Sequence, residues 1–598
     1  MGAGRSRDRR GRWRVSALDA LDEQQREAAS ILRGPVAILA GAGTGKTRAI
    51  THRIAHGVDT GAYTPSRLLA LTFTTKAAGE LRGRLRDLGV QGVVARTFHA
   101  AALSQLNYFW PTVAGDVAPK IIDNKVRLLA HAADGVGLRP DTATLRDVAS
   151  QIEWRKVTMR SIDAYAGLGR RVGQLSPDAL VAMMKSYEEL KDQRRQLDFE
   201  DVLLACAGML EGEPKVAAAV REQYRHFTVD EYQDVSPLQN RLLELWLGNR
   251  RDLCVVGDAS QTIYSFTGAD AKFLLDFSRR YPDAKVVRLE RNYRSDRTIV
   301  DVANALVKGR PGALRLVARD TDAHAPTPMV SAYDDERREA EGIAEAIERQ
   351  LTAGAAPDAI AVLYRVHAQS AAIQQAIAAR GIATTVLGGK RFFDLPEVRQ
   401  AILGLRAAAV APSTASIAGD FESGRTREDA VRIANVRDVL RSLGHSEDPP
   451  EAGGALRDTW EARQAIMRLA EEAPSGTTVR AFADAMLARA KDQHEPALKT
   501  VTLATVHAAK GLEWAHVHLA GVAEGLMPIS YATTLEQIDE ERRLAYVAIT
   551  RAARTLSVTW ARGTGRNERT PSRFIGEIVG PKALRAGSGS VALRPLED

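Results

Sequence analysis

The stretch PVAILAGAGTGKT, from Pro35 to Thr47, decides the fold of this chain. Its first half is apolar and predicts a buried strand, while its second half is a glycine-rich loop that ends in Lys46 and Thr47. In such a strand, loop and helix, backbone N–H groups approach phosphates, the lysine reaches the terminal oxygens and the threonine holds magnesium. The run therefore predicts a nucleotide site. The alternative is an ordinary tight turn, since Ala40 replaces the first glycine of the strict pattern.

The composition is that of a globular protein with several domains. The 598 residues are 45% hydrophobic and 26% charged, and the formal net charge is +8. No apolar run approaches the roughly 20 residues of a membrane-spanning helix, so we expect no membrane association and a reducing cytoplasm. The two cysteines, Cys206 and Cys254, cannot build a disulfide framework or a four-cysteine zinc site. The positive charge favours a polyanionic partner without identifying it.

Short apolar segments alternate with helical patterns along two stretches of the chain. The first group of predicted strands is VAILA, RLLALTFT, HFTVD and DLCVVGD, and the second is KVVRLE, IAVLYR, ATTVLGG, HVHLAGV and TLSVTWA. This alternation predicts an α/β fold with two cores, each a parallel sheet flanked by helices. Ligand groups are expected at the carboxyl ends of the strands.

The domain boundaries follow from where strands give way to purely helical patterns. We expect a first core at residues 18–106 and 198–284, a second core at 285–406 and 499–580, and helical insertions at 107–197 and 407–498. Residues 1–17 predict a basic flexible arm, which either touches phosphates or is only a solvated tail. Residues 581–598 predict a flexible tail.

An acidic segment, VDEYQD, follows one predicted strand. Asp230 suits a magnesium ion, and the adjacent Glu231 suits a water molecule whose proton it would accept. Such a pair is what a phosphate-binding loop needs for hydrolysis. The alternative is an acidic strand end that is simply solvated.

A second segment, VVGDASQTIYSFTGAD, begins at Val255. Gln261 follows a strand at a spacing that could reach a γ-phosphate or its water. Tyr264 and Phe266 come next, and aromatic rings near a basic surface are typical of single-strand nucleic-acid binding by base stacking. Each ring alone could equally belong to the hydrophobic core.

Twelve blocks occur in a characteristic order between about Leu21 and Phe574. They are LDEQQREAA, AGAGTGKTR, LTFTTKAAGELRGRL, RTFH, LDFEDVL, VDEYQD, GDASQTIYSFTGA, LERNYRS, GGKRFFDLPEV, VTLATVHAAKGLEW, EGLMP and ERRLAYVAITRA. With these blocks the chain resembles superfamily 1 DNA helicases of the UvrD/Rep/PcrA type. QTIYSFTGA and the second insertion resemble an actinobacterial UvrD-like paralogue group. The resemblance implies two RecA-like P-loop cores, each with a helical insertion subdomain.

The same resemblance implies an activity and partners. It implies an ATP- and Mg²⁺-dependent DNA helicase and translocase that moves 3′ to 5′ on single-stranded DNA in repair or replication restart. The expected partners are single-stranded DNA, single-strand/double-strand junctions and a DNA-repair protein, and the expected state is a monomer or weak dimer. The sequence ends soon after PSRF, so we expect it to lack the cysteine-rich and HRDC modules of some relatives.

The resemblance also implies roles for residues at the nucleotide. Gln25 reads the adenine edge, Arg48 and Tyr293 sandwich the base, and Glu513 contacts the ribose. Arg294 and Arg551 bind the γ-phosphate from the second core, unless they form only surface salt bridges. The phosphate-binding loop itself consists of Ala40, Gly41, Ala42, Gly43, Thr44, Gly45, Lys46 and Thr47, with Thr47 and Asp230 as the magnesium ligands.

On the DNA side, the resemblance implies stacking by Phe73, Tyr264 and Phe266. Four polar residues are expected along the DNA path: Thr97, His99, Thr505 and His507. For the two histidines, a packed and hydrogen-bonded core role is the alternative. The pairs His52/His56 and His516/His518 lack further ligands nearby in sequence, so neither is expected to bind a metal.

Two other functions stay open at this stage. The second insertion is short for the family and lacks its glycine-rich hairpin turn, so one alternative is a translocase that unwinds little without a partner. The other is a DNA-binding regulator that hydrolyses no ATP, against which the set of predicted catalytic residues argues: Lys46, Asp230, Glu231, Gln261, Arg294 and Arg551.

Overall fold

The computed structural model describes residues 17–319, 325–387, 393, 395–409, 426–448, 455–471, 473–491, 499–563, 568–579 and 590–595. The chain divides into two units. Unit 1 comprises Met1–Tyr293 and Val307–Arg319, and unit 2 comprises Arg294–Leu306 and Asp320–Asp598. The expected basic arm lies outside the described residues except for position 17.

Unit 1 is built on a six-stranded parallel sheet in the order β3-β2-β6-β7-β1-β8. The strands are β1 (Val36–Ala40), β2 (Leu68–Thr72), β3 (Val94–Thr97), β6 (His226–Val229), β7 (Leu253–Gly257) and β8 (Lys285–Leu289). β2, β6 and β7 are buried along their whole length and β1 nearly so. A parallel sheet that is covered by helices on both faces requires such continuous apolar strands.

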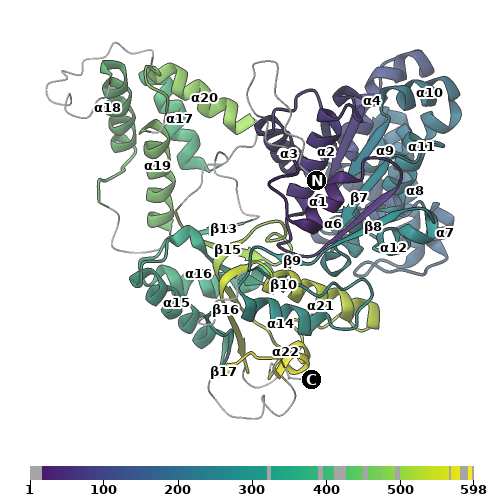
Figure 1. The fold of residues 1–598 in the computed structure, drawn as a ribbon. Coiled ribbons are helices and arrows are strands. Elements are labelled where there is room, and N and C mark those ends of the chain that lie inside the picture. Colours follow the sequence, from purple (N-terminus) through teal and green to yellow (C-terminus); the bar gives the residue numbers. More distant parts are fainter. Residues whose placement is uncertain are drawn as a thin grey trace, which may run out of the picture. The chain divides into compact units, whose positions relative to one another are not determined.

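Helices cover the two faces of this sheet (Figure 1). Because successive strand residues point to opposite faces, Val36, Ile38 and Ala40 join one buried cluster while Ala37 joins the other. The first cluster includes α1 (Glu23–Ser30), α2 (Lys46–Asp59) and α3 (Thr75–Asp87). The second includes α4 (Phe98–Ala114), α9 (Phe199–Gly212), α10 (Pro214–Gln223), α11 (Pro237–Leu247), α12 (Lys272–Leu275) and α13 (Phe277–Arg280).

The first insertion is helical and has its own core. It contains α5 (Lys125–Gly135), α6 (Thr142–Val157), α7 (Ile162–Ala166) and α8 (Pro177–Arg194). A side chain caps the N-terminus of each helix, with Asn124, Asp141, Ser161 and Ser176 as the acceptors. The short strands β4 (Lys120–Ile121) and β5 (Gln196–Leu197) pair where the chain enters and leaves the insertion.

The strand KVVRLE lies in unit 1 and not in the second core, where the sequence analysis placed it. As β8 it pairs in parallel with β1, with Val36 beside Lys285 and Ala40 beside Leu289. The chain then forms β9 (Arg291–Asn292), which pairs with β10 (Val317–Ala318) of the returning segment. The sheet to which a strand belongs depends on its pairing partner, and the local pattern of KVVRLE does not contain this information.

Unit 2 is built on a seven-stranded sheet in the order β13-β14-β12-β15-β16-β11-β17. The strands are β11 (Met329–Tyr333), β12 (Ile360–Tyr364), β13 (Thr384–Val386), β14 (Val501–Thr505), β15 (Trp514–Leu519), β16 (Ala552–Ala561) and β17 (Ser590–Ala592). All neighbouring pairs are parallel except β11 and β17. β17 corrects the expectation of a flexible tail at residues 590–592, because β11 offers these residues an open edge.

Helices also flank the second sheet. They are α14 (Arg297–Val307), α15 (Glu336–Thr352), α16 (Ser370–Ala378), α21 (Leu535–Ile549) and α22 (Arg573–Val579). Both units therefore have the predicted α/β architecture of parallel strands flanked by helices, consistent with two RecA-like domains.

The second insertion is a group of helices around a separate core (Figure 1). The core includes α17 (Pro396–Ala408), α18 (Arg427–Ser442), α19 (Ala455–Glu471) and α20 (Val479–Lys491). The polar loop at residues 410–425 lies outside the described residues. In the described part of the chain, no helix combines the length and the apolar character that a membrane span needs.

Candidate active site

The glycine-rich loop joins the carboxyl end of β1 to the first turn of α2. Gly43 and Gly45 have φ angles of 69° and 81°, a region that favours glycine. Thr44 Oγ1 donates a hydrogen bond of 2.8 Å to the Gly41 carbonyl and tightens the turn. Ala40 is fully buried in the core, so the methyl group that departs from the strict pattern faces apolar neighbours. The N-terminus of α2 therefore presents unpaired backbone N–H groups to an anion.

Two amides hold this loop from the outside. Gln25 on α1 is buried, and its Nε2 donates to the Thr44 carbonyl at 3.0 Å. Asn292 donates to the Ala42 carbonyl at 2.8 Å. A Cβ atom at Gly45 would lie 2.6 Å from Gln25 Nε2. Glycine at this position thus permits both the left-handed backbone and the close approach of the glutamine.

Tyr293 and Arg48, the predicted base-sandwiching pair, both lie in unit 1. The Tyr293 N–H donates to the Gly43 carbonyl at 2.8 Å, which fixes the tyrosine beside the loop. Its ring is half-exposed, and burial together with a hydrogen bond to Asp22 raises its pKa to about 12. Arg48 is exposed and donates to the Ala20 carbonyl at 2.6 Å. A ring and a cation beside a phosphate-binding loop are suitable for binding a nucleotide base.

Two carboxylates lie at the carboxyl end of β6, as predicted. Glu231 has a φ of 53°, a strained conformation for a residue with a side chain, and its Oε1 lies 3.9 Å from Lys46 Nζ. Burial, and then the Glu231 charge, raises the pKa of Asp230 to about 7 against the opposing effect of Lys46. The site therefore concentrates negative charge that one lysine only partly neutralises.

The sequence analysis missed two residues that connect the ends of β6 and β7. Gln233 is fully buried; its Nε2 donates to Glu231, and its Oε1 accepts the Asp258 N–H at 3.0 Å. Asp258 Oδ2 in turn accepts Gln261 Nε2 at 2.7 Å, within the short helix η3 (Ala259–Gln261). Lys46, Glu231 and Gln261 thus belong to one continuous polar network. Both missed residues occur inside quoted motifs, but only the adjacency of β6 and β7 reveals their bridging role.

The predicted stacking residues come together in unit 1. The rings of Phe73 and Tyr264 stack with centroids 5.4 Å apart and planes inclined by 17°. Phe266, in η4 (Ser265–Thr267), lies 6.1 Å from Tyr264 and is 61% exposed. Phe73 is 42% exposed. These exposures favour an accessible aromatic surface over the core alternative for Phe73 and Phe266.

Thr97 and His99 lie at the start of α4. Thr97 Oγ1 accepts the Ala100 N–H and caps the helix. The His99 ring contacts the exposed Phe199 edge-on at 6.0 Å, and burial lowers its pKa. Its Nε2 is buried without a hydrogen-bond partner. Packing of this kind agrees with the core alternative, although Phe199 adds a further exposed ring.

Unit 2 brings together the residues that were predicted to contact the ribose and γ-phosphate. Arg294 Nε donates to Glu513 Oε2 at 2.5 Å, and its Nη1 donates to the Thr550 carbonyl at 3.1 Å. Arg551 is 2% exposed and donates to the carbonyls of Val547 and Leu512, each at 3.0 Å. Neither arginine is therefore the surface salt bridge that the alternative envisaged, since both guanidinium groups also bind backbone carbonyls.

Thr505 and His507 lie just beyond the carboxyl end of β14 in unit 2. Thr505 Oγ1 accepts the Ala508 N–H at 3.3 Å. Burial, followed by the charge of Arg365, lowers the pKa of His507 to about 4. His507 is therefore a neutral polar group at neutral pH.

Comparison with protein families decides the relationship of the chain. A model of the UvrD/REP helicase N-terminal domain matches residues 21–282. A model of the UvrD-like helicase C-terminal domain matches residues 287–422 and 417–563. This chain belongs to the UvrD/Rep helicase family. The resemblance inferred from the twelve blocks is thereby confirmed.

Individual relatives of this UvrD/Rep helicase are similar over nearly the whole chain. The "ATP-dependent DNA helicase UvrD2" of Mycobacterium tuberculosis (strain ATCC 25618 / H37Rv) is 43% identical over 590 residues, covering 94% of this chain and 82% of that protein. The "ATP-dependent DNA helicase PcrA" of Leuconostoc citreum is 29% identical, covering 94% and 85%. That of Staphylococcus aureus (strain NCTC 8325 / PS 47) is 28% identical, covering 95% and 87%.

The donor set of this UvrD/Rep helicase fits a magnesium ion. Mg²⁺ prefers one or two protein oxygens and takes its remaining ligands from water and phosphate. Thr47 in the first turn of α2 and Asp230 at the end of β6 provide a hydroxyl and a carboxylate. The raised pKa of Asp230 shows that its charge lacks compensation, which a bound cation would supply.

Proposed function

We propose that this chain is an ATP- and Mg²⁺-dependent DNA helicase and translocase that moves 3′ to 5′ along single-stranded DNA. The observation that carries the proposal is the segment from Asp258 to Phe266. Gln261 joins the network that contains Lys46, while Tyr264 stacks on Phe73 only three residues further along. One rigid segment thus links the phosphate side of unit 1 to its exposed aromatic surface.

On the nucleotide side, each residue has a role that its surroundings support. Lys46 and the N–H groups of the loop bind the phosphates, while Thr47 and Asp230 hold magnesium, which neutralises phosphate charge. Glu231 orients the attacking water and accepts its proton. Gln261 contacts the γ-phosphate or that water, and Gln233 keeps Glu231 in position.

On the DNA side, Phe73, Tyr264 and Phe266 stack on bases. Base stacking on an aromatic ring contributes about 1–3 kcal/mol per base and tolerates any sequence. A change at Gln261 on hydrolysis would move Tyr264 and Phe266, because the connecting residues are buried and Thr267 Oγ1 donates to the Tyr264 carbonyl at 2.9 Å. Hydrolysis thereby alters the grip on the strand.

The remaining predicted contacts rest on the family resemblance. Gln25, Arg48 and Tyr293 bind the base, Glu513 the ribose, and Arg294 and Arg551 the γ-phosphate. Thr97, His99, Thr505 and His507 line the DNA path. We further infer that the protein works in the cytoplasm, in DNA repair or replication restart, on single strands and junctions, as a monomer or weak dimer with a repair partner.

A translocase that unwinds little by itself is the second candidate. The observation that favours it is the short second insertion, whose sequence lacks the glycine-rich hairpin turn of the family. A regulator that hydrolyses no ATP is disfavoured, because Lys46, Glu231, Gln233, Asp258 and Gln261 form a network suited to hydrolysis.

The test compares strand displacement on duplexes with a 3′ or a 5′ single-stranded tail, alongside DNA-stimulated ATP hydrolysis. We expect ATP-dependent opening of the 3′-tailed duplex only. Opening of the 5′-tailed duplex alone refutes the polarity. Translocation along single strands without displacement identifies the second candidate, and an absence of DNA-stimulated hydrolysis refutes the proposal.

A further inference from the structure

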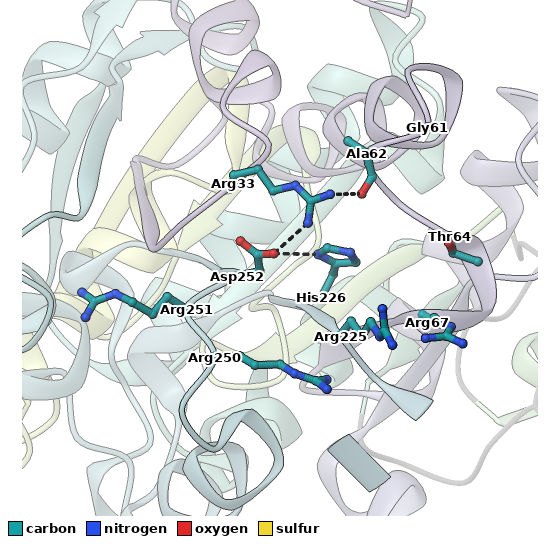
Figure 2. A pocket seen from close by; sticks show the side chains of 10 residues that line it. All are labelled: Arg33, Gly61, Ala62, Thr64, Arg67, Arg225, His226, Arg250, Arg251 and Asp252. Atoms are coloured by element: carbon teal, nitrogen blue, oxygen red, sulfur yellow. Dashed lines mark hydrogen bonds and ion pairs between the residues drawn. The ribbon is translucent and has the colours of Figure 1, made fainter. Parts of the chain in front are cut away.

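A basic pocket of about 860 Å³ lies at the amino ends of the strands in unit 1 (Figure 2). Its arginines come from segments that directly precede strands: Arg33 before β1, Arg67 before β2, Arg225 before β6, and Arg250 and Arg251 before β7. Amino ends of parallel strands share one edge of the sheet, and the glycine-rich loop lies at the other. We name this site the amino-edge pocket.

The amino-edge pocket has more positive than negative charge. Its five arginines contact three carboxylates: Asp252, Glu222 and Asp283. Glu222 is shared, because it lies 2.7 Å from Arg67, 2.5 Å from Arg225 and 3.8 Å from Arg250. The contacts of Arg225 and then Arg67 hold the pKa of Glu222 below its usual value. Two cations therefore exceed the anions in an open concave site.

Helix capping explains only part of this cluster. Arg33 donates to the Ala62 carbonyl at 2.8 Å and Arg250 donates to the Tyr224 carbonyl at 3.0 Å, just beyond the C-termini of α2 and α10. Arg67 and Arg225 have no such backbone contact and rest on exposed Glu222. A solvent-exposed ion pair contributes about 0–1 kcal/mol, so the fold gains little from these two arginines.

The chemistry of the lining selects phosphate groups as the ligand. Guanidinium groups bind phosphate oxygens in pairs and stay charged at every physiological pH. Among the described residues that line the pocket there is no Phe, Tyr or Trp, so nothing offers a stacking surface to a base. The pocket is therefore suited to a phosphodiester backbone without sequence preference.

We propose that the amino-edge pocket binds phosphodiester groups of a DNA strand that lies outside the path of Phe73, Tyr264 and Phe266. This inference rests on the proposed function, since a motor at a junction has a second strand close by. Contacts to that strand would retain the protein at the junction between steps of the motor.

The test replaces Arg67 and Arg225 by Gln in one variant. A matched control replaces Arg241 and Arg279 by Gln, because these exposed arginines of unit 1 also form surface ion pairs but lie outside the pocket. A third variant carries Lys at positions 67 and 225. Binding is measured by fluorescence anisotropy over a range of salt concentrations, with an oligonucleotide of about 10 nucleotides and with a forked duplex that has two long single-stranded arms.

For the fork, we expect the Gln variant to lose roughly 0.7 per lost contact in the slope of log affinity against log salt, which is roughly 25-fold near 0.1 M salt. The control and the Lys variant keep the wild-type slope. The short oligonucleotide binds all variants alike. Unchanged fork affinity in the Gln variant overturns the proposal, and hydrogen exchange across β6 and β7 verifies that the variant is folded.

Tripolyphosphate serves as the probe for a free phosphate ligand. Loss of its binding in the Gln variant, with fork binding unchanged, identifies a small phosphate ligand and overturns the DNA assignment. ATP hydrolysis by the wild type on the short oligonucleotide tests the proposed function separately. Its absence refutes that function whatever the fork measurements show.

Discussion

The two edges of the six-stranded sheet in unit 1 hold carboxylates in opposite electrostatic environments. At the carboxyl edge, burial and then Glu231 raise the pKa of Asp230 to about 7. At the amino edge, burial alone would raise the pKa of Asp252. Contacts with His226, the Gly34 N–H and Arg33 outweigh burial and hold that pKa well below its usual value.

This difference separates a functional site from a structurally neutralised one. Folded proteins place carboxylates next to one another mainly where a substrate or metal later compensates the charge. Asp230 and Glu231 have only Lys46 nearby, at 3.9 Å from Glu231. Asp252 already has its cations. Substitutions at the two edges should therefore change activity and stability in opposite directions.

The largest expected effect is at the carboxyl edge, where Lys46→Ala removes the cation of the phosphate-binding loop. DNA-stimulated ATP hydrolysis should fall by at least about 100- to 1000-fold, because no other side chain replaces that contact with the phosphates. Affinity for single-stranded DNA should stay near the wild-type value. Steady-state hydrolysis and anisotropy measure the two quantities.

The matched control for this substitution is Arg241→Ala, which removes an exposed cation on α11. It should leave both quantities unchanged. Full turnover in Lys46→Ala would contradict the assignment of the loop as the catalytic nucleotide site.

The next effect concerns the aromatic surface that the carboxyl edge supports. Phe266→Ala should weaken binding of single-stranded DNA by about 1–3 kcal/mol, at least about tenfold, because one stacking contact is lost. ATP hydrolysis without DNA should be unaffected. Tyr108→Ala, which removes a ring that is 76% exposed on α4, is the control. Equal losses in both variants would show that Phe266 has no special role in DNA binding.

The sequence predicts the carboxyl edge far better than the amino edge, for a physical reason. Lys46, Asp230 and Gln261 each occur in a contiguous motif whose local conformation nearly fixes the site. The amino-edge pocket combines segments as distant as Arg33 and Asp252, so only strand order brings them together. A single arginine before a strand has no meaning until its neighbours across the sheet are known.

The same limit explains the errors in the predicted fold. Both sheets and most strands follow from apolar runs bounded by turns. KVVRLE was placed in the wrong core because its pairing with β1 is non-local. β3 and β11 were missed, because half-buried side chains interrupt their apolar patterns. The role of Gln233 depends likewise on a neighbouring strand end.

Packing near the amino edge gives a third comparison, between two glycines in helices. A Cβ atom at Gly57 on α2 would lie 2.1 Å from the buried Tyr63 ring, which in turn stacks 4.6 Å from His226. Gly57→Ala should therefore destabilise unit 1 by about 1–3 kcal/mol. Gly83→Ala on α3, which meets no atom within 4 Å, should instead stabilise it by about 0.5–1 kcal/mol.

Hydrogen exchange of peptides from β6 and β7 measures both effects, since it reports the local stability of unit 1 even though the whole chain has several domains. Equal protection in the two glycine variants would show that Tyr63 moves aside freely.

The smallest effects test the opposite electrostatics directly. Asp230→Asn removes a repelled charge and should increase the stability of unit 1 by about 1–2 kcal/mol while hydrolysis is lost. Asp252→Asn loses its ion pair with Arg33 and should decrease stability by about 1 kcal/mol. Exchange of β6 and β7 amides, compared at neutral pH without added metal, measures both changes. A decrease in both variants would contradict the contrast between the edges.

The Asp252 effect should depend on pH in a defined direction. A carboxyl group whose pKa is lowered in the folded state stabilises the fold above its ordinary value near 4, and this contribution is lost as the pH falls. The deficit of Asp252→Asn should therefore be complete at about pH 6 and disappear towards about pH 3, because the wild-type carboxylate is then protonated as well. The Arg33 charge persists throughout, so a deficit that stays constant to low pH would assign the loss to the geometry of the Gly34 N–H contact and not to the charge of Asp252.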